Sequence, residues 1–399
     1  MSFTKYILPA LAASQVAFAT SSCGDTTIAS QTDADTLAAD CTTVSGDVTI
    51  KSSYASSLDL GAIKKITGTL SCTDAPNITS IIGASLTSIG GNFTLDGLTT
   101  LSELSFAELT SIGSIAWQAL PALYSLDFAA GVTEVGDLNI LNTALTTLDG
   151  ISLTSVGQFQ IEDNTGLKTC NISSLQNATG LISFAGNLDT LEVDLSSLGT
   201  GTSMTFRNIS SISIPSLEKL TGQLGFWGTD FATFSAPKLT TSGDLVFTDN
   251  SKLSNISMPV LKTVDGGFTV TRNDELQVID LPDLETVAGA IDFTGNFYEV
   301  EFGSLERVAG AFRIESTNGT FSCEKMKAAY KTTDIVKGSW NCYANTTDPT
   351  TATGESGTES GSSTGSSSTA TSSGAAIANG VAMPIAGVAA AFYALAQLI

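Results

Sequence analysis

Histidine is absent from this sequence of 399 residues, and basic residues are scarce, with 17 lysines and arginines against 39 acidic residues. The first absence excludes Ser-His and Cys-His nucleophilic pairs, imidazole acid–base catalysis and His-ligated zinc. The second excludes nucleic-acid partners, because a chain of net charge −22 has no basic stripe that would displace counterions from phosphates. Carboxylate-pair catalysis remains open, and the acidity favours a soluble, exposed surface.

The amino-terminal segment, residues 1–19, has the pattern of a secretory signal peptide. Lys5 precedes an apolar run that ends in Ala17–Ala19, which has the A-x-A form of a cleavage site. A membrane anchor is the alternative, but the apolar run is short and two polar residues interrupt it. The sequence therefore predicts a secreted, extracellular protein.

The carboxyl-terminal segment, residues 375–399, is apolar and uncharged and follows a group of small residues. Small residues, a short spacer and a hydrophobic tail are the arrangement of a glycosylphosphatidylinositol (GPI) attachment signal. A true membrane span would usually carry Lys or Arg beyond its apolar run. We predict GPI attachment at Gly374, with Ser373 as the alternative, so that residues 375–399 are a propeptide and a lipid holds the protein to the plasma membrane.

Residues 345–374 are rich in Ser and Thr, with some Gly and Pro, and cannot bury a core. Their composition predicts an extended, O-glycosylated stalk, and a plain flexible linker is the alternative. Residues 20–344 remain as the folded ectodomain.

A repeat of about 22 residues runs through the ectodomain: Phe268-x-Val270-x-x-Asn273 returns as Ile291-x-Phe293-x-x-Asn296. Each repeat holds an apolar-x-apolar pair. The first column of this pair is Val48, Leu70, Phe93, Ile115, Leu138, Phe159, Ile182, Met204, Leu224, Leu245, Phe268, Ile291 and Phe312. The second column is Ile50, Cys72, Leu95, Trp117, Ile140, Ile161, Phe184, Phe206, Phe226, Phe247, Val270, Phe293 and Ile314. A period in this range indicates a solenoid, whose turns bury their apolar faces only by stacking.

Each pair predicts a half-buried strand with both large side chains inward, and stacked copies pair in parallel about 4.8 Å apart. The expected fold class is mainly β: a right-handed parallel β-helix or leucine-rich-repeat-like solenoid of about 13 turns with short helical caps. The phenylalanines of the second column are expected to stack in the core. The residue between the two members of each pair points outward, and these residues are small and mostly polar, without aromatic platforms for sugar rings.

Five asparagines share the place that follows the strand, and turn chemistry explains them better than a binding site. They are expected to tie each corner to the next through side-chain-to-backbone hydrogen bonds. These residues are Asn164, Asn187, Asn250, Asn273 and Asn296.

Six cysteines in a secreted chain allow fifteen pairings, and the turn register removes many of them. Two pairs each bracket a short helical stretch at an end of the solenoid, where open strand edges need covering. We predict the disulfides Cys23–Cys41 and Cys323–Cys342. Cys72 and Cys170 lie about four turns, or roughly 19 Å, apart, so they are expected to remain unpaired, small, buried residues.

Eight N-x-Ser/Thr motifs predict N-glycosylation on turns, outward strand positions and the stalk. They are Asn77, Asn92, Asn171, Asn177, Asn208, Asn255, Asn318 and Asn345. Three aromatic residues, Tyr124, Trp227 and Tyr298, are candidates for exposed contact residues.

The segment Cys41-x-x-Val44-x-Gly46-x-Val48-x-Ile50 resembles the opening of a receptor L domain. The signal, this cysteine-led strand, the turn Val287–Phe297, the Cys323 cap, the stalk and the SGAA sequence before the tail together resemble fungal GPI-anchored cell-wall organisation proteins of the sporulation-specific and extracellular-mutant type. The resemblance covers nearly the full length. It implies a role in cell-wall organisation and integrity, with a location at the plasma membrane or in the wall.

Three functions are compared. The first is a non-enzymatic structural module of the cell surface, for which we predict no catalytic, cofactor-binding or metal-binding residues, and cell-wall glucan or mannoprotein as partners. The second is a ligand- or glycan-binding receptor-like module, by analogy of fold. The third is a wall polysaccharide-active enzyme, which would need clustered charged residues on one sheet face. The candidates for such a cluster are Asp292 and Arg313, with Asp163, Asp249 and Asp265 elsewhere.

Overall fold

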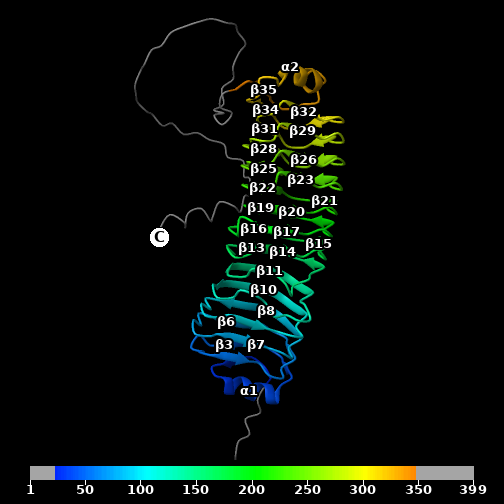
Figure 1. Cartoon of the computed structure of the whole chain (residues 1–399). Helices are drawn as coiled ribbons and strands as arrows, with labels where there is room; N and C mark the ends of the chain where they lie inside the picture. The colour runs from blue at the N-terminus through cyan, green and yellow to red at the C-terminus, as the bar shows by residue number, and fades with distance from the viewer. Residues whose placement is uncertain (1–22, 347–399) are drawn as a thin grey trace, which may run out of the picture. The chain divides into compact units, whose positions relative to one another are not determined.

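The structure, a computed structural model, describes residues 23–346. Within this range the chain winds into turns that stack along one axis (Figure 1). Each turn adds a strand to one parallel ladder. In this ladder Val48 pairs with Leu70 and Ile50 with Cys72, so that residues of the same apolar column are neighbours on adjacent strands. The prediction of a mainly β, parallel solenoid of about 13 turns is confirmed.

We call this ladder of strands the long ladder. Its strands are β1 (Thr26–Ile28), β3 (Val48–Ile50), β6 (Leu70–Thr73), β8 (Ser88–Asp96), β10 (Ser111–Leu120), β11 (Glu134–Thr143), β13 (Phe159–Glu162), β16 (Leu181–Ala185), β19 (Ser203–Arg207), β22 (Leu224–Trp227), β25 (Leu245–Thr248), β28 (Phe268–Thr271), β31 (Ile291–Gly295), β34 (Phe312–Ser316) and β35 (Trp340–Ala344).

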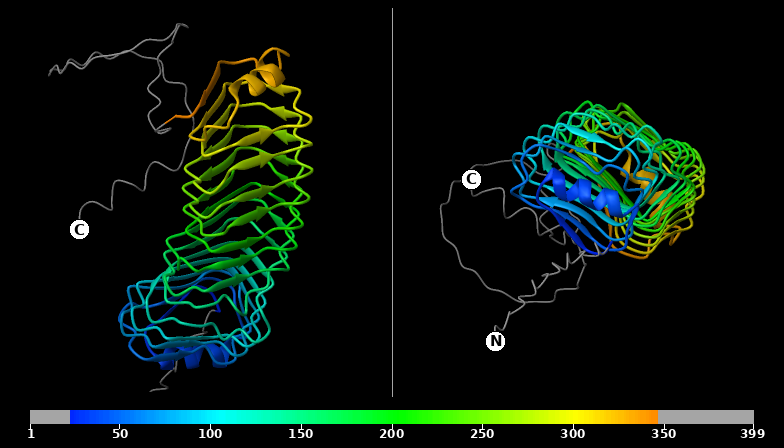
Figure 2. Two further views of the ribbon diagram at one scale, coloured as in Figure 1. Left: turned by 45° about the horizontal axis from the view of Figure 1, so that its top comes forward. Right: turned by 90° about the horizontal axis from the view of Figure 1, so that it is seen from below.

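Two further series of strands contribute to most of the turns, and the outlines of the turns overlap, with a sideways offset, when the structure is viewed from below (Figure 2). The middle strands are β4 (Ser57–Asp59), β7 (Ser80–Ile82), β9 (Glu103–Ser105), β14 (Thr169–Asn171), β17 (Glu192–Asp194), β20 (Ser211–Ser213), β23 (Thr233–Ser235), β26 (Asn255–Ser257), β29 (Val278–Asp280) and β32 (Glu299–Glu301). The short strands are β2 (Thr43–Val44), β5 (Lys65–Ile66), β12 (Ser155–Val156), β15 (Asn177–Ala178), β18 (Thr200–Gly201), β21 (Lys219–Leu220), β24 (Thr241–Ser242), β27 (Thr263–Val264), β30 (Thr286–Val287) and β33 (Arg307–Val308).

The interior of the rod is filled by the two apolar columns, whose members are all buried. Rings of the second column stack directly over one another: the centroid of Phe226 lies 5.3 Å from that of Phe206 and 5.2 Å from that of Phe247. The expected aromatic core is therefore present, with Phe247, Phe268 and Phe293 fully enclosed.

A column of glycines lies at the corner before the long ladder, where successive backbones come into direct contact. The N–H of Gly289 donates to the carbonyl of Gly266, with an N–O distance of 2.8 Å. A Cβ atom on Gly289 would lie 2.6 Å from the carbonyl group of Gly266, so no side chain fits between the two turns.

At the opposite corner, buried asparagines join the turns as the sequence predicts. Asn164 accepts hydrogen bonds from the backbone N–H and the hydroxyl of Thr143, and its Nδ2 donates to the carbonyl of Ile140, 3.0 Å away. Asn187 in turn accepts from the N–H of Asn164. Asn250 and Asn273 repeat this arrangement three and four turns after Asn187.

The prediction is wrong for Asn296, which is only half-buried and accepts a single 3.4 Å bond from the Thr317 hydroxyl. The residue before each of the four buried corner asparagines has a left-handed backbone, as at Asp249 with φ 59° and Arg272 with φ 53°. That conformation turns the next side chain inward. At Gly295 the strand continues instead, and Phe297 takes the buried position.

A short helix, α1 (Gln31–Asp40), covers the amino-terminal end of the stack. Ser30 caps its first turn together with Asp33, whose carboxylate accepts from the backbone N–H of Ser30. Two α1 side chains, Ala34 and Leu37, are buried against the first turns. The disulfide Cys23–Cys41 closes this cap, with a Cα–Cα distance of 5.7 Å.

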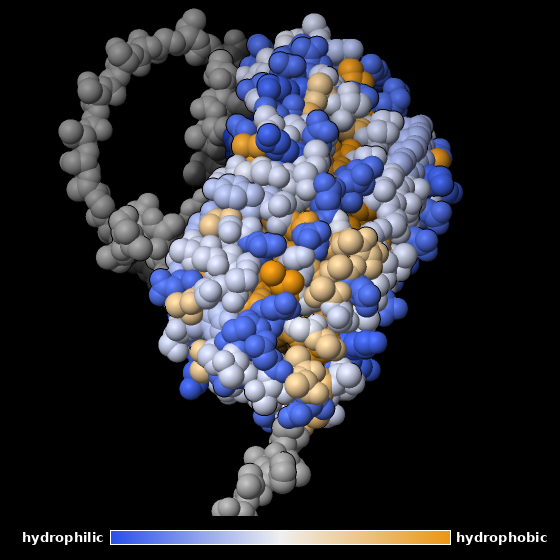
Figure 3. Space-filling model, turned by 60° about the horizontal axis from the view of Figure 1, so that its bottom comes forward, coloured by the Kyte–Doolittle hydropathy of each residue, from blue (hydrophilic) through white to orange (hydrophobic). Residues whose placement is uncertain are grey.

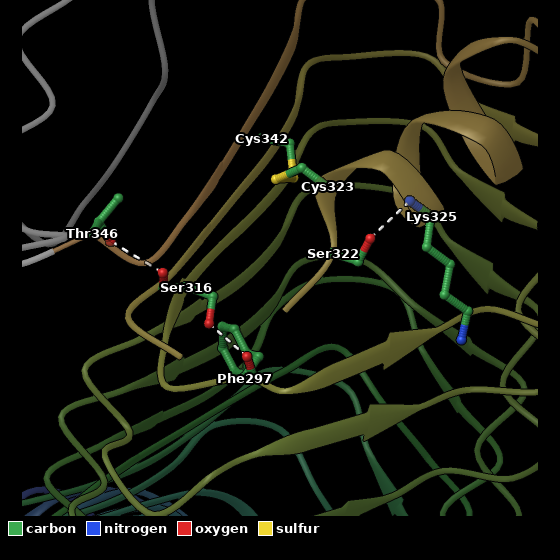
Figure 4. Close-up of a disulfide and its surroundings, with 7 residues drawn as sticks. All are labelled: Phe297, Ser316, Ser322, Cys323, Lys325, Cys342 and Thr346. Carbon is green, nitrogen blue, oxygen red and sulfur yellow. Dashed lines mark hydrogen bonds between the residues drawn. A yellow bond between two sulfur atoms is a disulfide. The ribbon is translucent and has the colours of Figure 1, made fainter. Parts of the chain in front are cut away.

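The carboxyl-terminal end is covered by α2 (Cys323–Met326), which continues as the single π-turn η1 (Lys327–Lys331). The Tyr330 hydroxyl accepts from the backbone N–H of Phe302, and the Trp340 ring stacks on Phe312 at 4.6 Å. The disulfide Cys323–Cys342 ties α2 to β35, and Thr346 bonds back to the carbonyl of Ser316 (Figure 4). The sequence columns omit β1 and β35, which extend the long ladder by one strand at each end.

Candidate functional site

The outer face of the long ladder carries small, closely spaced side chains, most of them half-buried between the turns above and below. Trp227 is among the larger side chains on this face, and it is not the exposed contact residue that the sequence suggests. Its ring lies against Gly225 of the same strand, and the Arg207 guanidinium sits 4.4 Å above it. This face therefore presents no free aromatic platform at Trp227.

Several charged residues on the outer surface pair between neighbouring turns. Arg313 contacts Asp292 of the preceding turn at 3.0 Å and Glu315 of its own strand at 2.9 Å. Arg272 contacts Asp249 at 2.7 Å, and this hydrogen bond lowers the pKa of the Asp249 carboxyl below its ordinary value. Such half-exposed pairs add little stability.

The remaining carboxylates named from the sequence, Asp163 and Asp265, lie at corners on separate turns. Between residues 23 and 346, no three Cys, Asp or Glu side chains come together as a metal-binding group. None of the helices in this part of the chain has the length and hydrophobicity of a membrane span.

Cys72 and Cys170 are unpaired and completely buried. Burial raises the pKa of the Cys72 thiol to about 12. Burial, with a smaller effect from Asp194, also raises the pKa of Cys170. Both residues are therefore neutral thiols in the core, without the thiolate character that reactive cysteines need.

Alkylation of the native protein is expected to label neither Cys72 nor Cys170, whereas unfolding without reductant should expose two thiols per chain. Intact-mass measurement before and after unfolding reports both numbers, and a C72S variant should show one thiol. Labelling in the native state, or a disulfide-linked peptide containing both residues, would contradict the register of the turns.

The eight glycosylation motifs lie on corners and on strands around the rod. Asn171 and Asn255 are exposed on middle strands, and Asn177 is exposed on a short strand. Asn77, Asn92, Asn208 and Asn345 are exposed at or near corners, while Asn318 is half-buried and accepts hydrogen bonds from Thr320. Occupancy of these positions stays a prediction.

Within residues 23–346, three tyrosines are the large aromatic side chains that protrude: Tyr124 is 60% exposed, Tyr298 46% and Tyr343 49%. The first two agree with the sequence analysis, whereas Tyr343 on β35 is unexpected because β35 lies outside the predicted columns. Tyr124 and Tyr298 each form one wall of a shallow groove. On the face drawn in Figure 3, hydrophilic and intermediate residues predominate, and hydrophobic residues show only as interrupted patches.

The predicted signal peptide, residues 1–19, and the propeptide, residues 375–399, lie outside the described residues, as do the attachment candidates Gly374 and Ser373 and most of the stalk. Their assignments stay predictions.

Comparison with known proteins gives a consistent group of relatives. A family model described as "Ecm33: GPI-anchored cell wall organization protein" matches residues 1–38. "Protein ecm33" of Aspergillus fumigatus is 55% identical over 90% of both chains. "Cell surface GPI-anchored protein" of Arthroderma benhamiae is 38% identical over 90% of this chain and 92% of its own.

A more distant relative, "Cell wall protein ecm33" of Schizosaccharomyces pombe, is 34% identical over 81% of this chain and 78% of its own. No solved structure matches. Because the identity extends over nearly the full length of several relatives, this chain belongs to the Ecm33 family of fungal GPI-anchored cell wall organisation proteins.

Proposed function

We propose that the protein is a non-enzymatic, GPI-anchored glycoprotein of the cell surface that is needed for cell-wall organisation and integrity. The observation that carries the proposal is its identity of 55% to a protein named for the family, over 90% of both chains. The fold is consistent with a role in contact rather than in chemistry, because the candidate charged residues Asp292 and Arg313 pair with each other, as do Asp249 and Arg272, instead of converging with Asp163 and Asp265 on one site. Two of the relatives are named as a cell surface GPI-anchored protein and as a cell wall protein.

The processing that this function requires is part of the proposal. Residues 1–19 direct secretion, residues 345–374 form a glycosylated stalk, and a GPI lipid replaces residues 375–399 at Gly374 or Ser373. The cap disulfides fit an extracellular site, because disulfides persist in oxidising compartments. Wall glucan and mannoprotein are the proposed partners, and the plasma membrane and the wall are the proposed locations.

Rescue of a fungal strain that lacks its own Ecm33-family protein tests the proposal. The null strain should be hypersensitive to wall-binding dyes, and the full chain should restore resistance. A chain that ends at residue 374 should be secreted into the medium and should fail to restore it, because it cannot receive the lipid. Failure of the full chain at normal abundance would contradict the proposed function.

The proposed lack of catalysis has its own measurement. Purified protein is incubated with wall glucan, chitin and mannoprotein, and released reducing sugar is followed over time. We expect no release above that of heat-denatured protein. Turnover that depended on Asp292 or Arg313 would instead establish the enzyme alternative.

A further inference from the structure

The groove beside Tyr124, which we call the Tyr124 groove, is built by three consecutive turns. Tyr124 lies at the corner after β10. Asn142, Thr143, Ala144 and Thr146 come from the corresponding corner of the next turn, and Thr165 and Gly166 from that of the turn after. The Tyr124 side chain and the exposed residues Asn142 and Thr165 form its rim. The stacking of the turns therefore brings together residues that lie about 20 positions apart in the sequence.

The floor and walls of this groove are held in place without a ligand. Thr143 is 4% exposed, and both its N–H and its hydroxyl donate to Oδ1 of the buried Asn164. The N–H and hydroxyl of Thr146 both donate to the carbonyl of Tyr124, at 3.1 and 3.3 Å. Because the backbone is fixed at both positions, the Tyr124 ring projects from a rigid support, and binding need not order the chain.

The chemistry of the lining is neutral, although the chain carries a net charge of −22. Tyr124 offers an apolar ring face and a hydroxyl group, while Asn142 and Thr165 offer hydrogen-bond donors and acceptors. A ligand that matches must be uncharged, rich in hydroxyl groups and apolar on one face. Pyranose rings have this combination, because axial C–H groups form a flat apolar face between equatorial hydroxyls.

We propose that the Tyr124 groove binds a neutral hexose chain, with one sugar ring stacked on Tyr124. The inference rests on the proposed function, because it supplies a contact between this protein and wall polysaccharide or mannoprotein glycan. A second groove provides a matched comparison: Tyr298 is similarly exposed, but its groove includes Glu299 and Lys325, which form a 3.8 Å ion pair.

The hexose chain has three possible sources: wall glucan, mannoprotein glycan, and the glycan of this protein at Asn77. The last source is included because Asn77 lies on the same corner two turns earlier. The N–H of Ser102 donates to the carbonyl of Thr79, and Ser105 forms a parallel bridge with Asp127, so these corners lie over one another. The purified full chain is therefore tested with glycans intact, after enzymatic deglycosylation, and as an N77Q variant.

Binding is measured by titration with soluble glucose and mannose oligosaccharides, with an anionic uronic-acid oligosaccharide as the charged comparison. We expect saturable binding of at least one neutral oligosaccharide, which Tyr124→Ala weakens at least about tenfold. Tyr124→Phe, which keeps the ring, and Tyr298→Ala should change the affinity less than about twofold. Binding that appears only after deglycosylation or in N77Q would identify the chain's own glycan as the natural occupant.

Absence of binding to every neutral oligosaccharide in all three preparations would overturn the proposal, and so would unchanged binding by Tyr124→Ala. Circular dichroism and the thermal midpoint show whether that variant folds, and its largely exposed side chain makes folding expected. Dye rescue tests the proposed function separately. A chain that restores dye resistance but binds no oligosaccharide would refute sugar binding at the Tyr124 groove and would leave the proposed function in place.

Discussion

Replacement of Phe226 by alanine is expected to lower the free energy of unfolding by about 3–5 kcal/mol. Phe226 is fully buried in the ring stack, between Phe206 and Phe247, and it also contacts Phe234 with a centroid distance of 4.8 Å. Its removal leaves a cavity that the neighbouring turns cannot close, because their backbones are already hydrogen-bonded to each other. The free energy of unfolding of a native protein is typically about 5–15 kcal/mol, so this loss is a large part of the total.

Denaturant unfolding followed by circular dichroism measures this change, with Phe226→Leu and Tyr124→Ala as comparisons. Phe226→Leu retains most of the volume and should cost less than about 2 kcal/mol. Tyr124→Ala removes an exposed side chain and should change stability by less than about 0.5 kcal/mol. Hydrogen exchange should locate the damage in the turns from Phe206 to Phe247, because a solenoid turn depends on its neighbours. A decrease in the free energy of unfolding of less than about 1.5 kcal/mol for Phe226→Ala would mean that the stacked rings contribute little to the stability of the solenoid.

The sequence alone predicts the long ladder because two constraints act on it together. Alternation of apolar and polar residues sets which side chains face inward, and the period of about 22 residues sets which of them stack. Phe184, Phe206 and Phe226 could therefore be placed one above another before any coordinates were known. The end strands β1 and β35 were missed for the same reason. Thr26 begins β1 with a polar residue, and the cap helix lengthens the last repeat so that Trp340 falls outside the period.

The outer surface is less predictable, because it depends on backbone details that no pattern of residue types records. Trp227 has the sequence position of an outward aromatic residue, yet the missing side chain of Gly225 gives its ring a place to lie. Tyr124 was recognisable as an exposed candidate, but its groove was not. The groove needs Asn142 and Thr165 beside it, and only the corner geometry of three turns shows that they meet there.

Replacement of Asn250 by alanine is expected to lower the free energy of unfolding by about 3–5 kcal/mol, although no apolar contact of comparable size is lost. The Asn250 side chain is fully buried and joins three groups: it accepts from the N–H of Thr229 at 2.8 Å and from the Thr229 hydroxyl at 2.6 Å, and it donates to the carbonyl of Phe226. Alanine leaves the N–H and the hydroxyl of Thr229 without their partner in the interior, and each unsatisfied group costs about 1–3 kcal/mol.

Asn296 is the matched control for Asn250, because it has the same place in the repeat but a different backbone. It is half-exposed and accepts one long bond from Thr317, so Asn296→Ala should cost less than about 1 kcal/mol. The double variant Asn250→Ala, Thr229→Val should be less destabilised than the sum of its single variants, since it removes the Thr229 hydroxyl together with its partner. Equal losses for Asn250→Ala and Asn296→Ala in denaturant unfolding would show that sequence position, rather than the left-handed corner, decides which asparagines hold the turns together.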